Sequence, residues 1–457
     1  MGEHVPKGRV ARGRRLGMLA AGQAARGATT RLSMVGRSER AREILAQRST
    51  MESAEQLVEV LGSLKGAAMK LGQMLSVLDL ELVPESHRER FREKLAVLCD
   101  RAPTTPFETM RRVLNDDFGS PSRVFRDFDE VPIAAASIGQ VYRATLRDGH
   151  DVAVKIQYPG VDAAVRSDLR NLALFAKMWK SMWPSLEGGL LVEEVARNLE
   201  HELDYLREAH NQHRVAQQYR DHPFVAVPDA IVEHCTRRVL VTEYFPSQSF
   251  GAMCELPGDQ RDRIGELIYR FYVGSLFLRN EFCGDPHPGN VLLAPDGRVG
   301  FIDFGLYNRM NPRDVEFERE VIRAAAEQRA DDLYSMMVRR GVVDPASAVS
   351  PELCLEYAWS ASAWNLLDES ITVTPALASG ALLSAIDPRA TQFEGIRQQQ
   401  LPPEHVFSRR ADFMTFGILG QLGATNNWHR IAREWIYGDP AVTEIGRALE
   451  GGKMPRN

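Results

Sequence analysis

Three oxygen-bearing side chains in the second half of the sequence have types and spacing suited to chemistry. Asp285 and Asn290 lie five residues apart, and Asp303 follows Asn290 by thirteen residues. Carboxylate and amide oxygens are ligands suited to Mg²⁺, and a carboxylate in a rigid loop can orient or deprotonate an attacking hydroxyl. Prolines and glycine make residues 284–290 such a loop. The pattern predicts Asn290 and Asp303 as metal ligands and Asp285 as a catalytic carboxylate. Taken alone, residues 285–290 also fit an ordinary turn.

The surroundings of Asp303 narrow this choice. The apolar run Gly300-Phe301-Ile302 precedes it, and Phe304 and Gly305 follow. An apolar strand would deliver the carboxylate into a cleft, and Gly305 would free the backbone after it. The order and spacing match the D-x-x-x-x-N and D-F-G elements with which kinases hold Mg²⁺. We therefore expect a nucleotide as partner, with ATP and Mg²⁺ as cofactors.

A lysine and an acidic partner complete the predicted phosphate site. Lys155 ends the β-prone run Val152-Ala153-Val154, where it would neutralise nucleotide phosphates, although strands also commonly end in an exposed lysine. Residues 191–220 are predicted as one helix, in which Asp204 and Glu208 share a face and Glu202 points elsewhere. We expect Glu208 to pair with Lys155. Glu202 and Asp204 then serve another role or face solvent.

Two departures from ordinary protein kinases stand out. No glycine-rich loop precedes Lys155, and an alanine-rich segment takes its place as the predicted nucleotide-binding loop, made of Ala134, Ala135, Ala136, Ser137, Ile138, Gly139, Gln140 and Val141. Alanine resists positive φ, so this loop should be stiffer than a glycine loop. Cys283-Gly284 stands where protein kinases have His-Arg, and no A-P-E follows Gly305. Control by activation-loop phosphorylation is therefore not expected.

The elements that must position these residues follow from periodicity and turn signals. Helices are expected at 52–82, 86–98, 106–118, 161–182, 191–220 and 259–282, and over most of the chain after 305, whereas strands are expected around the Asp148-Gly149 turn and at 224–227 and 239–244. Residues 246–257 are rich in turn residues and predict a hinge. The apolar stripe Phe407, Phe413, Met414, Phe416 and Leu419 fits a helical core face better than a lipid-binding surface.

Bulk properties limit the partners. A net charge of −5 does not favour nucleic-acid binding, so none is expected. Five scattered cysteines indicate neither a disulfide framework nor a zinc site, and a cytoplasmic location is expected. No apolar run is long enough to span a bilayer. The basic segment 1–36 is read either as a solvated tail or as a peripheral contact with an anionic membrane surface, where each Lys or Arg contributes about 1 kcal/mol.

With these residues in hand, the sequence resembles the UbiB/AarF/ADCK family of atypical kinases. Lys70-Leu71-Gly72-Gln73 matches the family's K-x-G-Q element, Ala135-Ala136-Ser137 its alanine-rich loop, and Glu202-Leu203-Asp204 its E-x-D element. The resemblance implies that Lys70 and Gln73 lie on a helix that covers the substrate site. It also implies that Lys70 approaches Glu202 or Asp204.

The resemblance implies an α+β, bilobal protein-kinase-like fold with a small β-sheet N-lobe, a helical C-lobe and a family-specific N-terminal helical extension. The corresponding stretches are a basic, flexible segment at 1–50, the extension at 51–122, the N-lobe at 123–245 and the C-lobe at 246–450. The implied function is an ATP- and Mg²⁺-dependent atypical kinase or ATPase that supports isoprenoid-quinone or related membrane-lipid metabolism, with isoprenoid or phenolic lipid precursors as partners. A protein serine/threonine kinase and a nucleotide-binding scaffold without turnover stay as alternatives.

Overall fold

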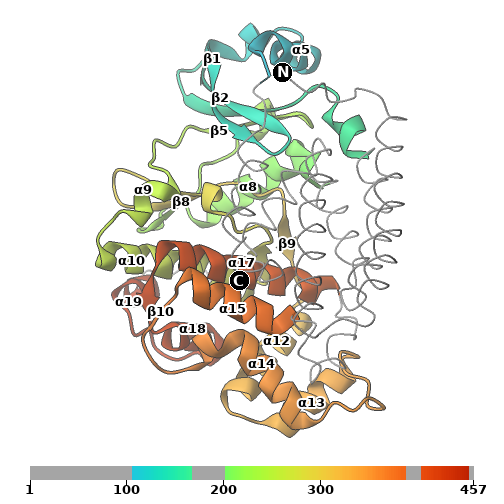
Figure 1. Cartoon of the computed structure of the whole chain (residues 1–457). Coiled ribbons are helices and arrows are strands. Elements are labelled where there is room, and N and C mark those ends of the chain that lie inside the picture. Colours follow the sequence, from blue (N-terminus) through green and yellow to red (C-terminus); the bar gives the residue numbers. More distant parts are fainter. Residues whose placement is uncertain (1–104, 167–200, 387–402, 452–457) are drawn as a thin grey trace, which may run out of the picture. The chain divides into compact units, whose positions relative to one another are not determined.

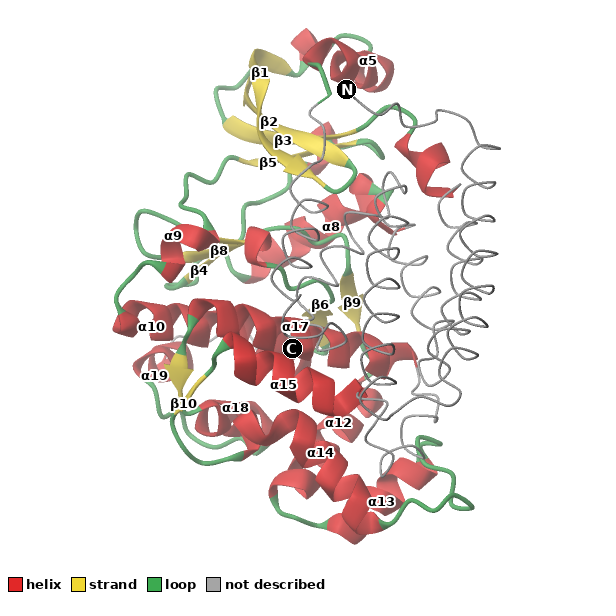
Figure 2. Cartoon of the chain, viewed as in Figure 1, coloured by secondary structure: helices red, strands yellow, loops and turns green. Residues whose placement is uncertain are grey.

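A computed structural model describes residues 105–166, 201–386 and 403–451 (Figure 1). Two compact units make up the chain: a first unit of residues 1–149 and 154–203, and a second unit of residues 150–153 and 204–457. The order of elements mixes strands and helices, as the predicted α+β class requires (Figure 2). The predicted domain boundaries at 50, 122 and 245 stay predictions.

In the first unit, helix α5 (Phe107–Phe118) packs on the long hairpin of strands β1 (Phe125–Ala136) and β2 (Gly139–Leu146). The ring of Phe107 stacks on Phe128 with their centroids 5.3 Å apart. Helix α5 ends at Gly119, whose φ of 69° suits a residue without a side chain. The helix expected at 106–118 is thereby confirmed.

The four-stranded sheet has the order β1-β2-β3-β5, with β3 at Asp151–Gln157 and β5 at Val239–Glu243. The chain turns between β2 and β3 at Gly149, where φ is 97°. This confirms the hairpin expected around Asp148-Gly149. The boundary between the two units runs through β3.

The second unit holds the remaining elements. They are α8 (Tyr205–Gln218), β4 (Val225–Ala226), α9 (Phe250–Cys254), α10 (Gly258–Tyr269), α11 (Ser275–Arg279), β6 (Glu281–Cys283), β7 (Val291–Leu293), β8 (Val299–Phe301), β9 (Tyr307–Arg309), α12 (Pro312–Ala326), α13 (Ala330–Arg339), α14 (Pro351–Leu366), β10 (Ile371–Thr372), α15 (Pro375–Ile386), α17 (Pro403–Leu422), β11 (Thr425–Asn426), α18 (Trp428–Ile436) and α19 (Glu444–Gly451). Strands β4, β8 and β7 form one small sheet, and β6 pairs with β9. The turn-rich stretch expected at 246–257 contains the short helix α9.

The core of the second unit surrounds the continuous helical stretch 258–279, in which a π-helical segment at Arg270–Gly274 joins α10 to α11. Tyr269 meets three tryptophans, Trp364, Trp428 and Trp435. Phe416 and Leu419 of α17 are buried in the same core, and Met414 is also buried, which favours the core interpretation of the C-terminal apolar stripe. Helices α10 and α17 run side by side (Figure 1).

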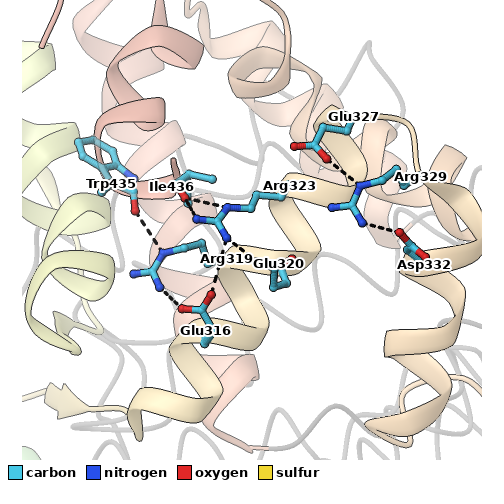
Figure 3. A network of polar contacts seen from close by, with 9 residues as sticks. All are labelled: Glu316, Arg319, Glu320, Arg323, Glu327, Arg329, Asp332, Trp435 and Ile436. Carbon is cyan, nitrogen blue, oxygen red and sulfur yellow. Dashed lines mark hydrogen bonds and ion pairs between the residues drawn. The ribbon is translucent and has the colours of Figure 1, made fainter. Parts of the chain in front are cut away.

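Arginines on α12 satisfy the last turn of α18 (Figure 3). Arg319 donates to the carbonyl of Trp435 at 3.2 Å, and Arg323 donates through Nε to the carbonyl of Ile436 at 2.9 Å. The last carbonyls of a helix have no partner within the helix, and cationic side chains are favourable there. Arg319 and Arg323 thereby join two helices that are separated by a hundred residues of sequence.

The prediction of one helix through 191–220 is wrong at Asp204. Helix α8 begins at Tyr205, and Asp204 is its N-cap, with a side chain that accepts a hydrogen bond from the Arg207 amide at 3.2 Å. Asp204 and Glu208 therefore do not form a pair on one helical face. Helix capping explains why the helix starts at Tyr205, because an aspartate before a helix satisfies an amide that would otherwise lack a partner.

The segments expected as helices at 52–82 and 86–98 lie outside the described residues, as does most of 161–182. No helix within the described ranges is long and apolar enough to cross a membrane.

His222 gives a prediction on pH and stability. The side chain is buried after α8, and its Nδ1 accepts from the amides of Phe224 at 3.2 Å and Val225 at 2.9 Å. Burial, with a smaller contribution from Arg279, lowers the pKa of His222 to about 4. Below about pH 6.5 the unfolded chain binds a proton at this histidine, whereas the folded chain does not until about pH 4. The free energy of unfolding should therefore fall as pH drops from about 6.5 toward 4, by at most about 3 kcal/mol.

The measurement is urea unfolding of the wild type and His222→Asn at pH 7, 6 and 5. The variant should lose this part of the pH dependence, whereas His213→Asn, at a half-exposed position, should retain it. Identical pH profiles for all three proteins would contradict the prediction.

Candidate functional site

In the second unit, the loop after β6 and the end of β8 lie close together. Strands β7 and β8 pair with Val291 opposite Phe301, and the amide of Ile302 donates to the carbonyl of Asn290 at 3.1 Å. The side-chain amide of Asn290 donates to the carbonyl of Asp285 at 3.4 Å. These bonds bring the predicted catalytic loop next to the segment that carries Asp303.

Asp303 sits in an unusual backbone conformation. Its φ is 70°, in the left-handed region that aspartate and asparagine tolerate better than most residues. Its Oδ1 accepts from the amide of Gly305 at 3.3 Å, and its carbonyl accepts from the thiol of Cys283 at 3.6 Å. Such conformations cluster at functional sites, where the surrounding structure fixes them.

Helix α8 holds this segment in place. Arg207 donates to the carbonyl of Gly305 at 2.6 Å, and Asn211 donates to the carbonyl of Phe304 at 3.2 Å. Sequence reasoning did not find a role for either side chain, because no motif marks a contact to backbone carbonyls more than ninety residues away. Desolvation lowers the pKa of Arg207, while Asp204 and then Glu208 oppose that shift.

Glu208 is 2% exposed and points toward the same segment. A Cβ placed on Gly305 would lie 3.6 Å from Oε2 of Glu208 and 3.5 Å from Oδ1 of Asp303. Two carboxylates therefore face the small space beside Gly305. Two negative charges near each other favour a cation between or beside them.

Asp285 is 6% exposed, and its Oδ1 accepts from Arg410 of α17 at 3.2 Å. Nearby charges also affect the pKa of a buried tyrosine, Tyr272. Burial, and then the charges of Cys283, Asp285 and Asp303, hold the pKa of Tyr272 well above its usual range. The Tyr272 hydroxyl thus stays protonated at neutral pH.

The first unit carries the predicted nucleotide-binding residues. Lys155 lies on β3 between Val154 and Ile156, both of which are fully buried. The alanine-rich segment forms the tip of the β1–β2 hairpin, where Ala135 pairs with Gln140 and Ala136 with Gly139. The predicted loop is therefore strand for most of its length.

Two polar residues of this hairpin have partners within the first unit. Ser137 donates from Oγ to Oε2 of Glu202 at 2.9 Å, so the alanine-rich tip contacts the E-x-D element directly. Gln140 is fully buried, and its amide nitrogen donates to the hydroxyl of Tyr142 at 2.6 Å. A buried amide with such a bond supports the hairpin, and a direct role of Gln140 toward nucleotide stays a prediction.

The second unit thus brings together Glu208, Asp285, Asn290 and Asp303, while Lys155, the segment 134–141 and Glu202 belong to the first unit. Asp204 stands at the start of α8 as a cap. Lys70 and Gln73 lie outside the described residues. The pairing of Lys155 with Glu208, and the approach of Lys70 to Glu202 or Asp204, stay predictions.

The oxygen donors of the second unit fit Mg²⁺. In the part of the chain that the structure describes, no three His, Cys, Asp or Glu residues cluster as a metal cage. Mg²⁺ at phosphoryl-transfer sites needs no such cage, because one or two protein oxygens suffice and water and phosphates supply the other ligands. Asp303 and Asn290, whose segments are hydrogen-bonded to each other, are donors of this kind.

A family model and several named relatives identify the family to which the chain belongs. Residues 97–337 match the family described as ABC1 atypical kinase-like domain. The chain is 31% identical over 350 residues to AarF domain-containing protein kinase 1 of Gallus gallus, which covers 74% of this chain and 64% of that protein. It is 36% identical over 287 residues to the mitochondrial atypical kinase COQ8B of Rattus norvegicus, covering 61% of this chain and 52% of that protein.

A solved structure is also similar. It is the complex of Rv3197 with erythromycin from Mycobacterium tuberculosis, which is 32% identical with a TM-score of 0.61. The similarity covers 86% of this chain and 98% of that chain. By contrast, this chain spans between 37% and 64% of the length of these curated relatives.

Proposed function

Because this chain belongs to the ABC1 family of atypical kinase-like proteins, we propose that it is an ATP- and Mg²⁺-dependent enzyme that supports isoprenoid-quinone or related membrane-lipid metabolism. The family supports the kinase or ATPase class. The observation that carries the proposal is the arrangement of Asp285, Asn290 and Asp303 on hydrogen-bonded segments, with Glu208 facing the same space as Asp303.

In this proposal each residue has one task. Asn290 and Asp303 would hold Mg²⁺, which neutralises charge on the phosphates when it is bound. Lys155 would neutralise nucleotide phosphates and would be oriented by Glu208. Asp285 would orient the attacking hydroxyl, whether of water or of an acceptor, and accept its proton. Arg207 and Asn211 keep the Asp303 segment fixed, so that little reorganisation is needed during reaction.

The lipid side of the proposal rests on the relatives and on the sequence. The chain resembles proteins whose names place them in mitochondria or chloroplasts, such as COQ8B of rat and the chloroplastic ACTIVITY OF BC1 COMPLEX KINASE 8 of Arabidopsis thaliana. The basic segment 1–36 supplies the charge for a peripheral contact with anionic lipid.

The test is release of phosphate from ATP by the purified full chain. We expect hydrolysis that requires Mg²⁺ and that rises when vesicles of phosphatidylcholine with phosphatidylglycerol replace vesicles of phosphatidylcholine alone. Absence of Mg²⁺-dependent release with either vesicle would refute the enzymatic proposal. Transfer of labelled phosphate to added proteins, at a rate matching hydrolysis, would favour the protein kinase alternative.

The pathway needs a separate experiment. Quinones and their prenylated precursors are measured in a deletion strain complemented with wild type or with Asp303→Asn. We expect precursors to accumulate in the deletion strain and in the variant, and to return to normal levels with the wild type. Equal lipid profiles in all strains would separate the enzyme from quinone metabolism.

A further inference from the structure

We propose that Arg410 of helix α17 is the positioning residue for the catalytic carboxylate of Asp285. The proposal deepens the proposed function and rests on it, because it takes Asp285 as the group that orients the attacking hydroxyl. The two residues are 125 positions apart in the sequence, and both belong to the second unit.

The contact is a charged hydrogen bond in a nearly buried place. A guanidinium nitrogen of Arg410 lies 3.2 Å from Oδ1 of Asp285, and the two side chains are 10% and 8% exposed. Charge-assisted bonds are stronger than neutral ones, and they lose less to solvent screening when they are buried. Arg410 therefore fixes the orientation of the carboxylate.

The backbone near Asp285 explains why the arginine comes from elsewhere. A Cβ at Gly284 would lie 2.8 Å from Nδ2 of Asn308 and 3.1 Å from the carbonyl oxygen of Leu306. The amide of Gly284 also donates to that carbonyl at 2.8 Å. The chain at Gly284 thus packs closely against the segment before β9, which leaves little room for a side chain at position 284. Helix α17 supplies a cation that contacts Asp285.

Helix α17 is well suited to hold this arginine. Leu419 and Leu422 of α17 are fully buried in the core cluster that also contains Cys283 of β6. The adjacent Arg409 lies 3.4 Å from Oε2 of Glu318 on α12. The position of Arg410 along the helix is therefore fixed from both sides, and a fixed guanidinium can impose its geometry on Asp285.

Positioning has a different kinetic signature from binding. Arg410→Ala should lower kcat for ATP hydrolysis by roughly 10–100-fold, because a small displacement of a catalytic group costs about that much. The Kd for ATP should stay close to the wild-type value. Arg410→Lys keeps the charge and should restore part of kcat.

Two comparisons test whether Arg410 acts through Asp285. Arg410→Ala should have little further effect in an Asp285→Asn background if it acts through Asp285. Arg409→Ala removes a neighbouring arginine of the same helix, so it controls for loss of helix stability. Equal effects of Arg410→Ala in both backgrounds would overturn the proposal. A raised Kd for ATP with unchanged kcat would also overturn it and would indicate that Arg410 contacts the nucleotide instead.

A readout without turnover separates this proposal from the proposed function. Hydrogen exchange of the amides between Cys283 and Asn290 should be faster in Arg410→Ala than in the wild type and in Arg409→Ala. If wild type fails to hydrolyse ATP, the proposed function fails, while faster exchange still supports Arg410 as the residue that positions Asp285. Unchanged exchange in this loop overturns the positioning role whatever the activity.

Discussion

Asp303→Asn is expected to lower kcat for Mg²⁺-dependent ATP hydrolysis by at least about 10³-fold, because it removes the negative charge that would hold the metal near the phosphates. Asparagine is the most informative replacement at position 303. Asp303 has a φ of 70°, and asparagine tolerates that conformation about as well as aspartate. The fold should therefore persist while the charge is lost.

The measurement combines turnover with binding. Phosphate release should collapse in Asp303→Asn, and the dependence of ATP affinity on Mg²⁺ should weaken. Asp296→Asn is the matched control, since Asp296 sits in the exposed turn between β7 and β8 and pairs with the nearby Arg298. A variant at position 303 with wild-type turnover would remove Asp303 from the metal site.

Arg270→Ala is expected to cause the largest loss of stability, about 3–5 kcal/mol, because it leaves buried carboxylates without their cation. Arg270 begins the π-helical segment, and its side chain is 11% exposed. It bonds both oxygens of Glu434, at 2.6 and 2.7 Å, and Oε1 of Glu266 at 2.7 Å. The pKa of Arg270 is raised above its usual value because those acids outweigh the cost of its burial.

Urea unfolding followed by tryptophan fluorescence measures this effect, since Trp364, Trp428 and Trp435 lie in the same core. Arg430→Ala is the control, because Arg430 forms a similar pair with Asp368 at 2.6 Å in which both side chains are about half exposed. Exposed pairs contribute up to about 1 kcal/mol. Equal losses in the two variants would contradict the role given to burial.

The sequence was most informative where local patterns decide structure. The Asp-Gly turn before β3, the helix at 107–118 and the buried helical stretch after 258 follow from turn residues and apolar spacing. The order and spacing of Asp285, Asn290 and Asp303 also predicted elements that the structure places on hydrogen-bonded segments. These features depend on residues near each other in the chain.

Long-range contacts account for most of what the sequence did not reveal. The partners Arg207–Gly305, Asn211–Phe304 and Arg410–Asp285 are 98, 93 and 125 residues apart. The residues next to an arginine or asparagine in the sequence do not indicate which distant carbonyl or carboxylate its side chain will contact. The helix start at Tyr205 is a different case. An aspartate in a polar run that could continue a helix acts as an N-cap only when the preceding segment ends there, and the sequence of 191–220 does not show that it ends at Asp204.

The buried helical stretch 258–279 has a consequence for synthesis of the protein in the cell. Its aromatic residue Tyr269 is covered in part by Trp428 and Trp435, which leave the ribosome about 160 residues later. At roughly 5–20 residues per second, that interval lasts on the order of ten seconds. During this time Tyr269 lacks its contacts with these two tryptophans. We therefore expect the nascent chain to engage a chaperone between these two stages, and ribosome profiling of chaperone-bound nascent chains should show contact beginning after residue 279 emerges and ending once α18 has emerged.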